Sequence, residues 1–214
     1  MLKTEGIVLR RVEVRETSLM LTCFTRDQGK IQGLVKGVRG ARAAVPWFME
    51  PLTLQHLVVY ERRRSPWALI GACDLVDGFA PLRSDLQRVA YGMMFLDLVE
   101  AMTEIRDPHP EIYGLLLSAL RSLEKRLDPR SVARFLEARL LRVCGHLPEP
   151  RLLTLTGQGR AALEGILRQS EAALLSEAEE AELRRLLRGL LHRVLERELK
   201  TRLFLHSIGL DKAA

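Results

Sequence analysis

The chain has few cysteines and no long apolar run. Its three cysteines, Cys23, Cys73 and Cys144, lie far apart, and none belongs to a Cys-x-x-Cys pair. This pattern offers neither a disulfide framework nor a four-cysteine zinc site, and it is typical of a reducing compartment. The first residues lack the apolar stretch of a secretory signal, and no apolar run approaches the roughly 20 residues that span a bilayer. We therefore expect a cytoplasmic protein that does not contact membranes.

The motifs of common enzyme sites are also missing. The Gly29-Lys30 pair lacks the upstream glycine and the following Ser or Thr of a phosphate-binding P-loop. The five histidines show no His-Glu-x-x-His or other metal-ligand spacing. Cys144 and His146 are separated only by Gly145 near a helix end, where such neighbours rarely face each other. We therefore predict a protein that is not an enzyme and that has no catalytic residue, metal or cofactor.

The positive charge of the chain is concentrated in its first third. Residues 1–64 hold 12 Lys plus Arg against 6 Asp plus Glu, whereas residues 65–214 hold 21 of each. The stretch from Lys30 to Arg42 carries four cations, and no acidic residue follows until Glu50. Such a local field attracts polyanions and releases their counterions on binding. The charge predicts a nucleic-acid partner or another anionic surface.

Residues 1–79 have the pattern of a small β-barrel. Short stretches rich in β-branched residues alternate with polar breaks, which predicts strands. The predicted strands span residues 4–14, 18–25, 30–38, 53–60 and 67–76. Five short strands, with an irregular element between the third and fourth, favour a closed barrel of the OB type. An SH3-like barrel is the closest structural alternative.

Residues 80–214 have helical periodicity instead, so we expect an α+β chain: an OB-fold β-barrel followed by an all-α domain. Apolar residues recur at three- and four-residue intervals. The predicted helices span residues 84–104, 110–127, 129–144, 156–169 and 176–199. Ser84 is the expected cap of the first helix, Asp128 that of the third, and Ser176 with Glu179 has capping-box spacing.

An OB barrel binds single strands with a positive groove and with aromatic rings on which bases stack. The expected phosphate-binding cations are Arg10, Arg11, Lys30, Lys36, Arg39, Arg42, Arg62, Arg63 and Arg64. The candidate rings are Phe24, Trp47, Phe48, Tyr60 and Trp67, although small barrels also need large side chains inside. Of these, Trp47 and Tyr60 are the preferred exposed rings.

Several segments resemble the RecO family of bacterial recombination mediators. T-E-G-I-V-L-R-R begins at residue 4, and F-T-R-D-Q-G-K and V-K-G-V-R follow it in the order and spacing of that family. F-L-E-A-R-L-L-R-V-C-G-H-L-P, at residues 135–148, is similar to a family helix that ends in Gly and then Pro. The segment E-L-K-T-R-L-F-L-H-S-I-G-L is similar to the C-terminal helix. The resemblance covers nearly the whole chain, but the four-cysteine zinc module of many members is missing.

The resemblance implies a nucleoid-associated protein that binds single- and double-stranded DNA and anneals complementary strands. It also implies cooperation with RecR in loading RecA onto strands coated by the single-stranded DNA-binding protein. The family contacts the acidic, Phe-ended tail of that protein through a basic and apolar pocket. This combination is present in Lys200, Arg202, Leu203 and Phe204. The same four residues fit equally well an ordinary packed helix whose cationic side chains extend to solvent. A protein adaptor and an RNA-binding OB protein remain the alternatives.

Overall fold

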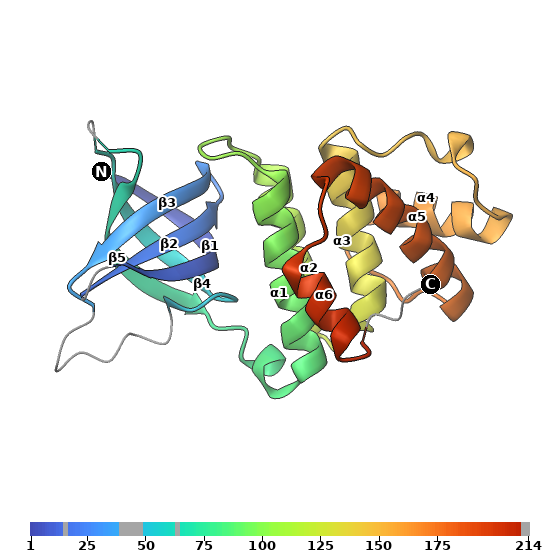
Figure 1. Cartoon of the computed structure of the whole chain (residues 1–214), viewed down its shortest axis with the longest axis horizontal. Helices are drawn as coiled ribbons and strands as arrows, with labels where there is room; N and C mark the ends of the chain where they lie inside the picture. Colours follow the sequence, from blue (N-terminus) through green and yellow to red (C-terminus); the bar gives the residue numbers. More distant parts are fainter. Residues whose placement is uncertain (15–16, 39–48, 63–64, 211–214) are drawn as a thin grey trace. The chain divides into compact units, whose positions relative to one another are not determined.

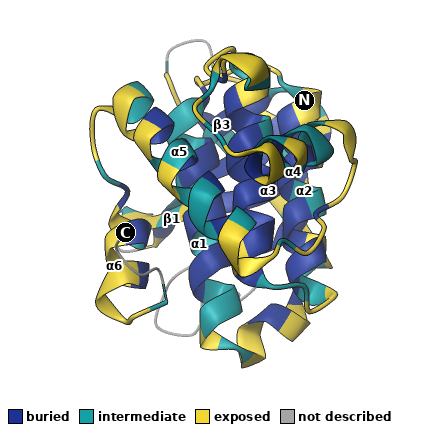
Figure 2. Ribbon diagram, turned by 90° about the vertical axis from the view of Figure 1, so that its right-hand side faces the viewer, coloured by how far each residue is buried: buried dark blue, intermediate teal, exposed yellow. Residues whose placement is uncertain are grey.

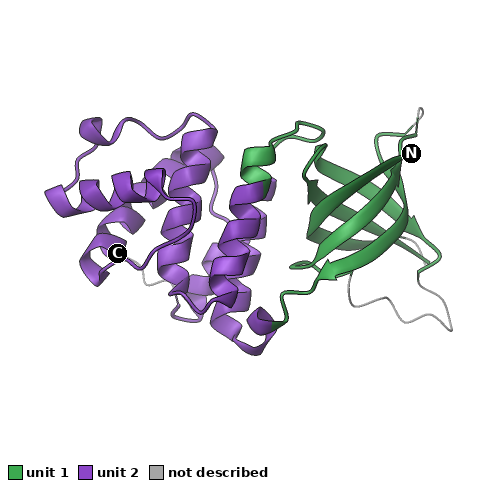
Figure 3. Ribbon diagram, turned by 180° about the vertical axis from the view of Figure 1, so that it is seen from behind, with its two compact units in different colours: residues 1–80, 103–113 green, residues 81–102, 114–214 purple. Residues whose placement is uncertain are grey.

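The computed structural model describes residues 1–14, 17–38, 49–62 and 65–210 (Figure 1). It divides into two compact units (Figure 3). The first unit comprises residues 1–80 and 103–113, and the second comprises residues 81–102 and 114–214. The first unit thus includes a segment that the sequence analysis assigned to the helical domain.

The first unit is a closed barrel of five strands. The strands are β1 (Leu2–Val14), β2 (Ser18–Thr25), β3 (Gly29–Lys36), β4 (Leu54–Tyr60) and β5 (Ala68–Asp77). They follow the order β1-β2-β3-β5-β4, in which only the β3–β5 pairing is parallel and β1 pairs with both β2 and β4. This architecture confirms the expected OB-like barrel followed by a helical region.

Alternation along the strands decides which side chains fill the barrel. Leu19 and Leu21 of β2 are fully buried, and their neighbours in the core include Val35, Val59 and Ile70. Because successive side chains in a strand point to opposite faces, the residues between these positions face outward. Glycine at position 33 is required by this core, since a Cβ there would lie 2.5 Å from a side-chain carbon of Ile70.

The segment 103–113 is fixed to the barrel at the turn that begins β3. Lys30 forms an isolated parallel bridge with Ile105, and its carbonyl accepts a hydrogen bond from the Arg106 amide at 2.8 Å. Gly29 has a φ of +62°, and a Cβ there would lie 1.9 Å from the carbonyl oxygen of Asp107. Only glycine permits both the backbone conformation and this close approach.

The second unit is helical, with bounds close to the expected ones. Its helices are α1 (Leu86–Met102), α2 (Pro110–Glu124), α3 (Pro129–Val143), α4 (Gly157–Arg168), α5 (Glu177–Leu195) and α6 (Lys200–Ser207), with 3-10 turns at Ala80–Ser84 and Pro150–Leu152. The first turn of α2, residues 110–113, belongs to the first unit. The N-caps at Asp128 and Ser176 are confirmed, the second as a full capping box. Two expectations were wrong. Asp85 rather than Ser84 caps α1, through its carboxylate. The helix expected over residues 176–199 ends earlier, at Leu195, because Glu196 adopts a left-handed conformation with a φ of +53°.

Helix α3 forms the centre of the helical unit, and most of its residues are drawn as buried in Figure 2. It also carries buried charges. Arg134 pairs with Glu180 of α5 at 3.0 Å and with Glu137 one turn along at 3.0 Å, and Glu137 in turn accepts a hydrogen bond from Arg202 of α6. A buried charge is tolerated only when it is paired in this way. This network therefore ties α5 and α6 to α3.

Candidate nucleic-acid interface

Strand register brings five residues into one row across the outside of the barrel. Val12 pairs with Met20, Met20 with Leu34, Leu34 with Leu69, and Leu69 with Tyr60. Val12 and Tyr60 are 42% and 40% exposed, and the three residues between them are half-buried. Cross-strand partners lie on the same face, at about 4.5–5.5 Å between their Cβ atoms. We refer to these five residues as the apolar row.

A cation lies on each side of the apolar row. Arg10 precedes Val12 by two residues on β1, and Lys36 follows Leu34 by two residues on β3. Both are therefore on the outward face, and both are exposed. The arrangement offers apolar contact for bases along the middle and positive charge for phosphates on either side, which are the two components of single-strand binding.

Two exposed rings lie where β4 ends and β5 begins. The ring of Tyr60 lies over the main chain of Gly71, since a Cβ at that glycine would be 2.6 Å from the ring edge. Trp67 is 46% exposed, more than Tyr60, although the sequence analysis did not prefer it. Phe24 is fully buried and cannot receive a base. Arg62 is exposed in the same connection.

Lys30 is a correction to the expected phosphate-binding set. Its side chain is buried, and its ammonium donates a hydrogen bond to the carbonyl of Thr103. Lys30 pairs with Phe24 across β2 and β3, on a face that the segment 103–113 covers. Arg11 is half-buried and forms an ion pair with Glu50, so its charge is locally balanced.

The remaining candidates lie outside the described residues. These are Arg39, Arg42, Trp47, Phe48, Arg63 and Arg64. The candidate interface described by the structure therefore consists of the apolar row together with Arg10, Lys36, Arg62 and Trp67.

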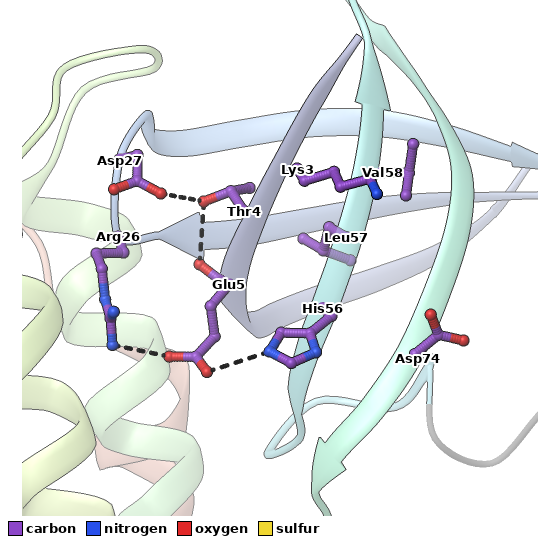
Figure 4. Close-up of a pocket in the computed structure, with 9 residues that line it drawn as sticks. All are labelled: Lys3, Thr4, Glu5, Arg26, Asp27, His56, Leu57, Val58 and Asp74. Carbon is purple, nitrogen blue, oxygen red and sulfur yellow. Dashed lines mark hydrogen bonds and ion pairs between the residues drawn. The ribbon is translucent and has the colours of Figure 1, made fainter.

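A hollow of about 520 Å³ on the first unit has a different character. Figure 4 shows Glu5 at its centre, where its carboxylate accepts a hydrogen bond from Arg26 at 3.1 Å and lies 3.6 Å from the ring nitrogen of His56. Asp27 accepts a hydrogen bond from Thr4 at 2.9 Å, and Asp74 is also part of the lining. Since acidic and basic groups balance here, this hollow does not attract phosphate as Arg10 and Lys36 do.

The helical unit has an apolar hollow of about 310 Å³ between α1 and α6. Its lining consists of Leu86, Val89, Ala90, Met93, Lys200, Thr201 and Phe204. Phe204 is 47% exposed, and Lys200 is the one charged residue of the lining. Two of the expected partner-binding residues lie elsewhere. Arg202 is buried in its pairing with Glu137, and Leu203 is exposed but does not line the hollow.

The thiols are not activated. Burial raises the pKa of Cys73 to about 12 and the pKa of the fully buried Cys23 further above its ordinary value. Burial also raises the pKa of Cys144. Thiolate is the nucleophilic form, so all three groups are weak nucleophiles near neutral pH.

No group of three or more His, Cys, Asp or Glu residues with the geometry of a metal site occurs in the described part of the chain. Within those same residues, no helix is both long and apolar enough to cross a membrane.

A closed five-stranded barrel with a basic and apolar outer row, followed by a helical unit, defines an OB-type protein of two units. Family comparison agrees with this architecture. The sequence model described as Recombination protein O N terminal matches residues 1–79, and the one described as Recombination protein O C terminal matches residues 83–151. The chain belongs to the RecO family.

Curated relatives carry the name DNA repair protein RecO. The one from Exiguobacterium sibiricum is 31% identical over 159 residues, which cover 74% of this chain and 63% of that protein. The one from Moorella thermoacetica is 31% identical over 166 residues, which cover 75% of this chain and 61% of that protein. The chain thus spans less than two thirds of the length of these relatives.

Proposed function

We propose that this chain is a non-enzymatic DNA-binding protein of DNA repair, which binds single strands on the outer face of its barrel. The observation that carries the proposal is the apolar row with an exposed cation on either side of it. Bases of a single strand are free to contact Met20, Leu34 and Tyr60, whereas bases stacked within a duplex are not. Double-stranded DNA would be held by its phosphates alone.

Family membership extends the proposal to recombination. We propose that the protein anneals complementary strands and that, with RecR, it helps to load RecA onto strands coated by the single-stranded DNA-binding protein. Annealing brings two polyanions together, and a basic surface aids this step by replacing condensed counterions. An annealing assay on precoated strands, with and without RecR, tests this part of the proposal. Equal annealing rates with and without the protein would refute it.

Fluorescence anisotropy with labelled oligonucleotides tests the barrel face. Tyr60→Ala should weaken single-strand binding by about 1–3 kcal/mol, the value of one base stack. Lys36→Glu should weaken binding about equally for all sequences and lower the salt slope by about one. Lys3→Glu is the matched control, because Lys3 is an exposed strand lysine that lies in the charge-balanced hollow. Equal losses at Lys3 and Lys36 would refute the assignment of this face.

The same titrations separate the alternatives. An absence of salt-sensitive binding to any oligonucleotide would favour the protein adaptor. A preference for RNA over a DNA strand of matched sequence would favour the RNA-binding OB protein.

We also propose that the hollow between α1 and α6 receives the acidic, Phe-ended tail of the single-stranded DNA-binding protein. The almost wholly apolar lining suits a phenyl ring, and Lys200 supplies a positive charge for the terminal carboxylate. Phe204→Ala and Lys200→Glu should both weaken binding of a labelled acidic peptide that ends in Phe. Leu174→Ala is the control, because Leu174 is 71% exposed and lies outside the hollow. Unchanged peptide affinity in both hollow variants would refute this site.

A further inference from the structure

The second half of α5 carries a basic surface that the charge distribution of the whole chain conceals. The first turn of this helix is acidic, with Glu177, Glu179 and Glu180. From Arg184 to Leu195 the helix then holds four arginines and one histidine, and it has no acidic residue. The two halves cancel in a count over residues 65–214, where Lys plus Arg equals Asp plus Glu.

The four arginines fall into two groups. Arg184 and Arg188 are half-buried, and Arg188 pairs with Glu198 at 3.2 Å. Arg185 and Arg193 are exposed, and neither has a carboxylate within ion-pair distance among the residues that the structure describes. The first group thus has a structural role, whereas the second group presents charge to solvent.

Arg185 and Arg193 share one face of α5 with Gly189 and His192, and we refer to these four residues as the α5 basic face. Arg185, Gly189 and Arg193 are spaced by four residues, which corresponds to about 6 Å per step along the axis. All four are exposed, and Figure 2 shows how exposed and buried residues alternate along this helix. A Cβ at Gly189 would meet nothing within 4 Å, so an extended ligand has open access between the two arginines.

One acidic residue of α5, Glu182, acts on this face, and it precedes Arg185 by three residues. Glu182 accepts hydrogen bonds from the amide and the hydroxyl of Thr156, at 2.6 and 2.7 Å, and these bonds, followed by the attraction to Arg185, lower the pKa of Glu182. Glu182 thus offsets part of the charge of Arg185, although it is not within ion-pair distance of it. Glu196 lies at the C-cap, beyond the last helical residue.

Complementing the helix dipole explains only part of this pattern. Cations stabilise a helix at its C-terminus, but the effect is confined to about the last turn. His192 and Arg193 lie in that turn, whereas Arg185 lies more than two turns earlier. The helix dipole therefore does not account for the exposed charge at Arg185.

We infer that the α5 basic face binds the phosphate backbone of a second nucleic-acid strand while the barrel holds the first. This inference rests on the proposed function, because annealing requires two strands on one protein molecule. Two exposed arginines about two turns apart, without an exposed apolar side chain between them, suit a sugar-phosphate backbone, and glycine allows that backbone to approach closely. An acidic peptide would gain little on this face beyond charge, since the hollow that His192 lines there has a volume of only about 10 Å³, which is too small for an apolar anchor.

A charge placed at Gly189 gives the sharpest test. Gly189→Glu introduces a carboxylate into the centre of the face, and Gly189→Gln is the neutral control of the same size. Neither substitution should unfold the protein, because a side chain at this position meets no neighbouring atom and because Glu and Gln both have a higher helix propensity than Gly. Arg185→Ala with Arg193→Ala is the second test, and Arg121→Ala with Arg151→Ala, which are exposed arginines elsewhere in the unit, is its control.

Three measurements are made on the full chain: affinity for one labelled strand, capture of a second and non-complementary labelled strand, and annealing rate. We expect Gly189→Glu and the Arg185/Arg193 double variant to leave the first affinity within about twofold. Both should lower second-strand capture and annealing by about tenfold or more, and the double variant should lower the salt slope of capture by about two. Both control variants should behave as the wild type.

The outcomes distinguish this inference from the proposed function. Unchanged capture and annealing in Gly189→Glu and in the double variant would overturn the inference and leave the barrel site intact. Loss in Gly189→Glu and Gly189→Gln alike would overturn it as well, because the effect would then be steric. If Tyr60→Ala and Lys36→Glu leave first-strand binding unchanged while the α5 variants abolish it, the barrel proposal fails and the α5 basic face remains. A last outcome concerns the nature of the ligand. If the α5 basic face binds polyglutamate in place of a second strand, and Gly189→Glu abolishes that binding, the partner is an acidic protein and the inference is overturned.

Discussion

The ammonium of Lys30 donates a hydrogen bond to the main-chain carbonyl of Thr103, 73 residues further along the chain. The two residues belong to the same compact unit, in which segment 103–113 pairs with the start of β3. Tyr113, at the other end of that segment, donates a hydrogen bond to Glu5 of β1 at 2.7 Å. The segment is therefore part of the barrel structure, although it lies between two helices in the sequence.

Lys30 and Lys36 should have opposite effects when they are mutated. Lys30→Met removes the hydrogen bond from the buried ammonium to the carbonyl of Thr103, so we expect a loss of about 1–3 kcal/mol in the free energy of unfolding. Affinity of the folded protein for single strands should not change. Lys36→Met should leave stability within about 0.5 kcal/mol, because Lys36 is exposed, and should weaken binding. Urea unfolding and anisotropy together check the pair. A binding loss for Lys30→Met without a stability loss would restore Lys30 to the interface.

Gly29 and Gly37 allow a second matched comparison. Both have positive φ, +62° and +72°, so an alanine at either position is strained by about 1–2 kcal/mol. A Cβ at Gly29 would also collide with the carbonyl of Asp107, whereas a Cβ at Gly37 meets nothing within 4 Å. Gly29→Ala should therefore lower the free energy of unfolding by clearly more than Gly37→Ala does. Thermal and urea unfolding measure the difference, and equal losses would show that the contact with segment 103–113 contributes nothing.

The sequence was sufficient for the barrel because its strands and turns are local features. The strands are short stretches rich in β-branched residues between polar breaks, and the Asp128 and Ser176 caps follow directly from residue type and spacing. The burial of Lys30 could not be predicted, since it depends on a segment that is distant in the sequence.

The candidate site was predictable only in part. An exposed Tyr60 and the cations Arg10 and Lys36 were expected, but Met20, Leu34 and Leu69 look like ordinary core residues when the sequence is considered alone. Only the register of the strands places these three on the outer face. The burial of Arg202 was missed for a similar reason, because its partner Glu137 is 65 residues away.

The buried network around Glu137 should be sensitive to loss of a single charge. Glu137→Gln removes the negative charge shared by Arg134 and Arg202, and leaving a buried charge without its partner costs about 3–5 kcal/mol. Arg202 belongs to α6, so hydrogen exchange should increase most in that helix. Peptide binding to the hollow between α1 and α6 should weaken as well, because Phe204 and Lys200 lie on α6.

Glu149→Gln is the control for this network, because Glu149 pairs with Arg142 on the surface at 3.1 Å, with about half of each side chain exposed. We expect it to change stability by at most about 1 kcal/mol. Equal effects of the two substitutions would mean that the buried network does not hold α6 in place.

The capping box of α5 should make stability depend on pH in the acidic range. The Ser176 hydroxyl and amide donate hydrogen bonds to the Glu179 carboxylate at 2.7 and 2.8 Å, and these bonds lower the pKa of Glu179. A carboxylate whose pKa is lower in the folded state stabilises the fold above its ordinary pKa, and this contribution is lost as the pH falls through the lowered value. Ser176→Ala should therefore lower the free energy of unfolding by about 1 kcal/mol at pH 7 and by less at pH 3.

Urea unfolding of the wild type and of this variant at both pH values measures the difference. Glu177→Gln, which changes an acidic residue of the same turn outside the capping box, is the control. If Ser176→Ala costs the same at both pH values, the bond between Ser176 and the ionised Glu179 does not stabilise the helix.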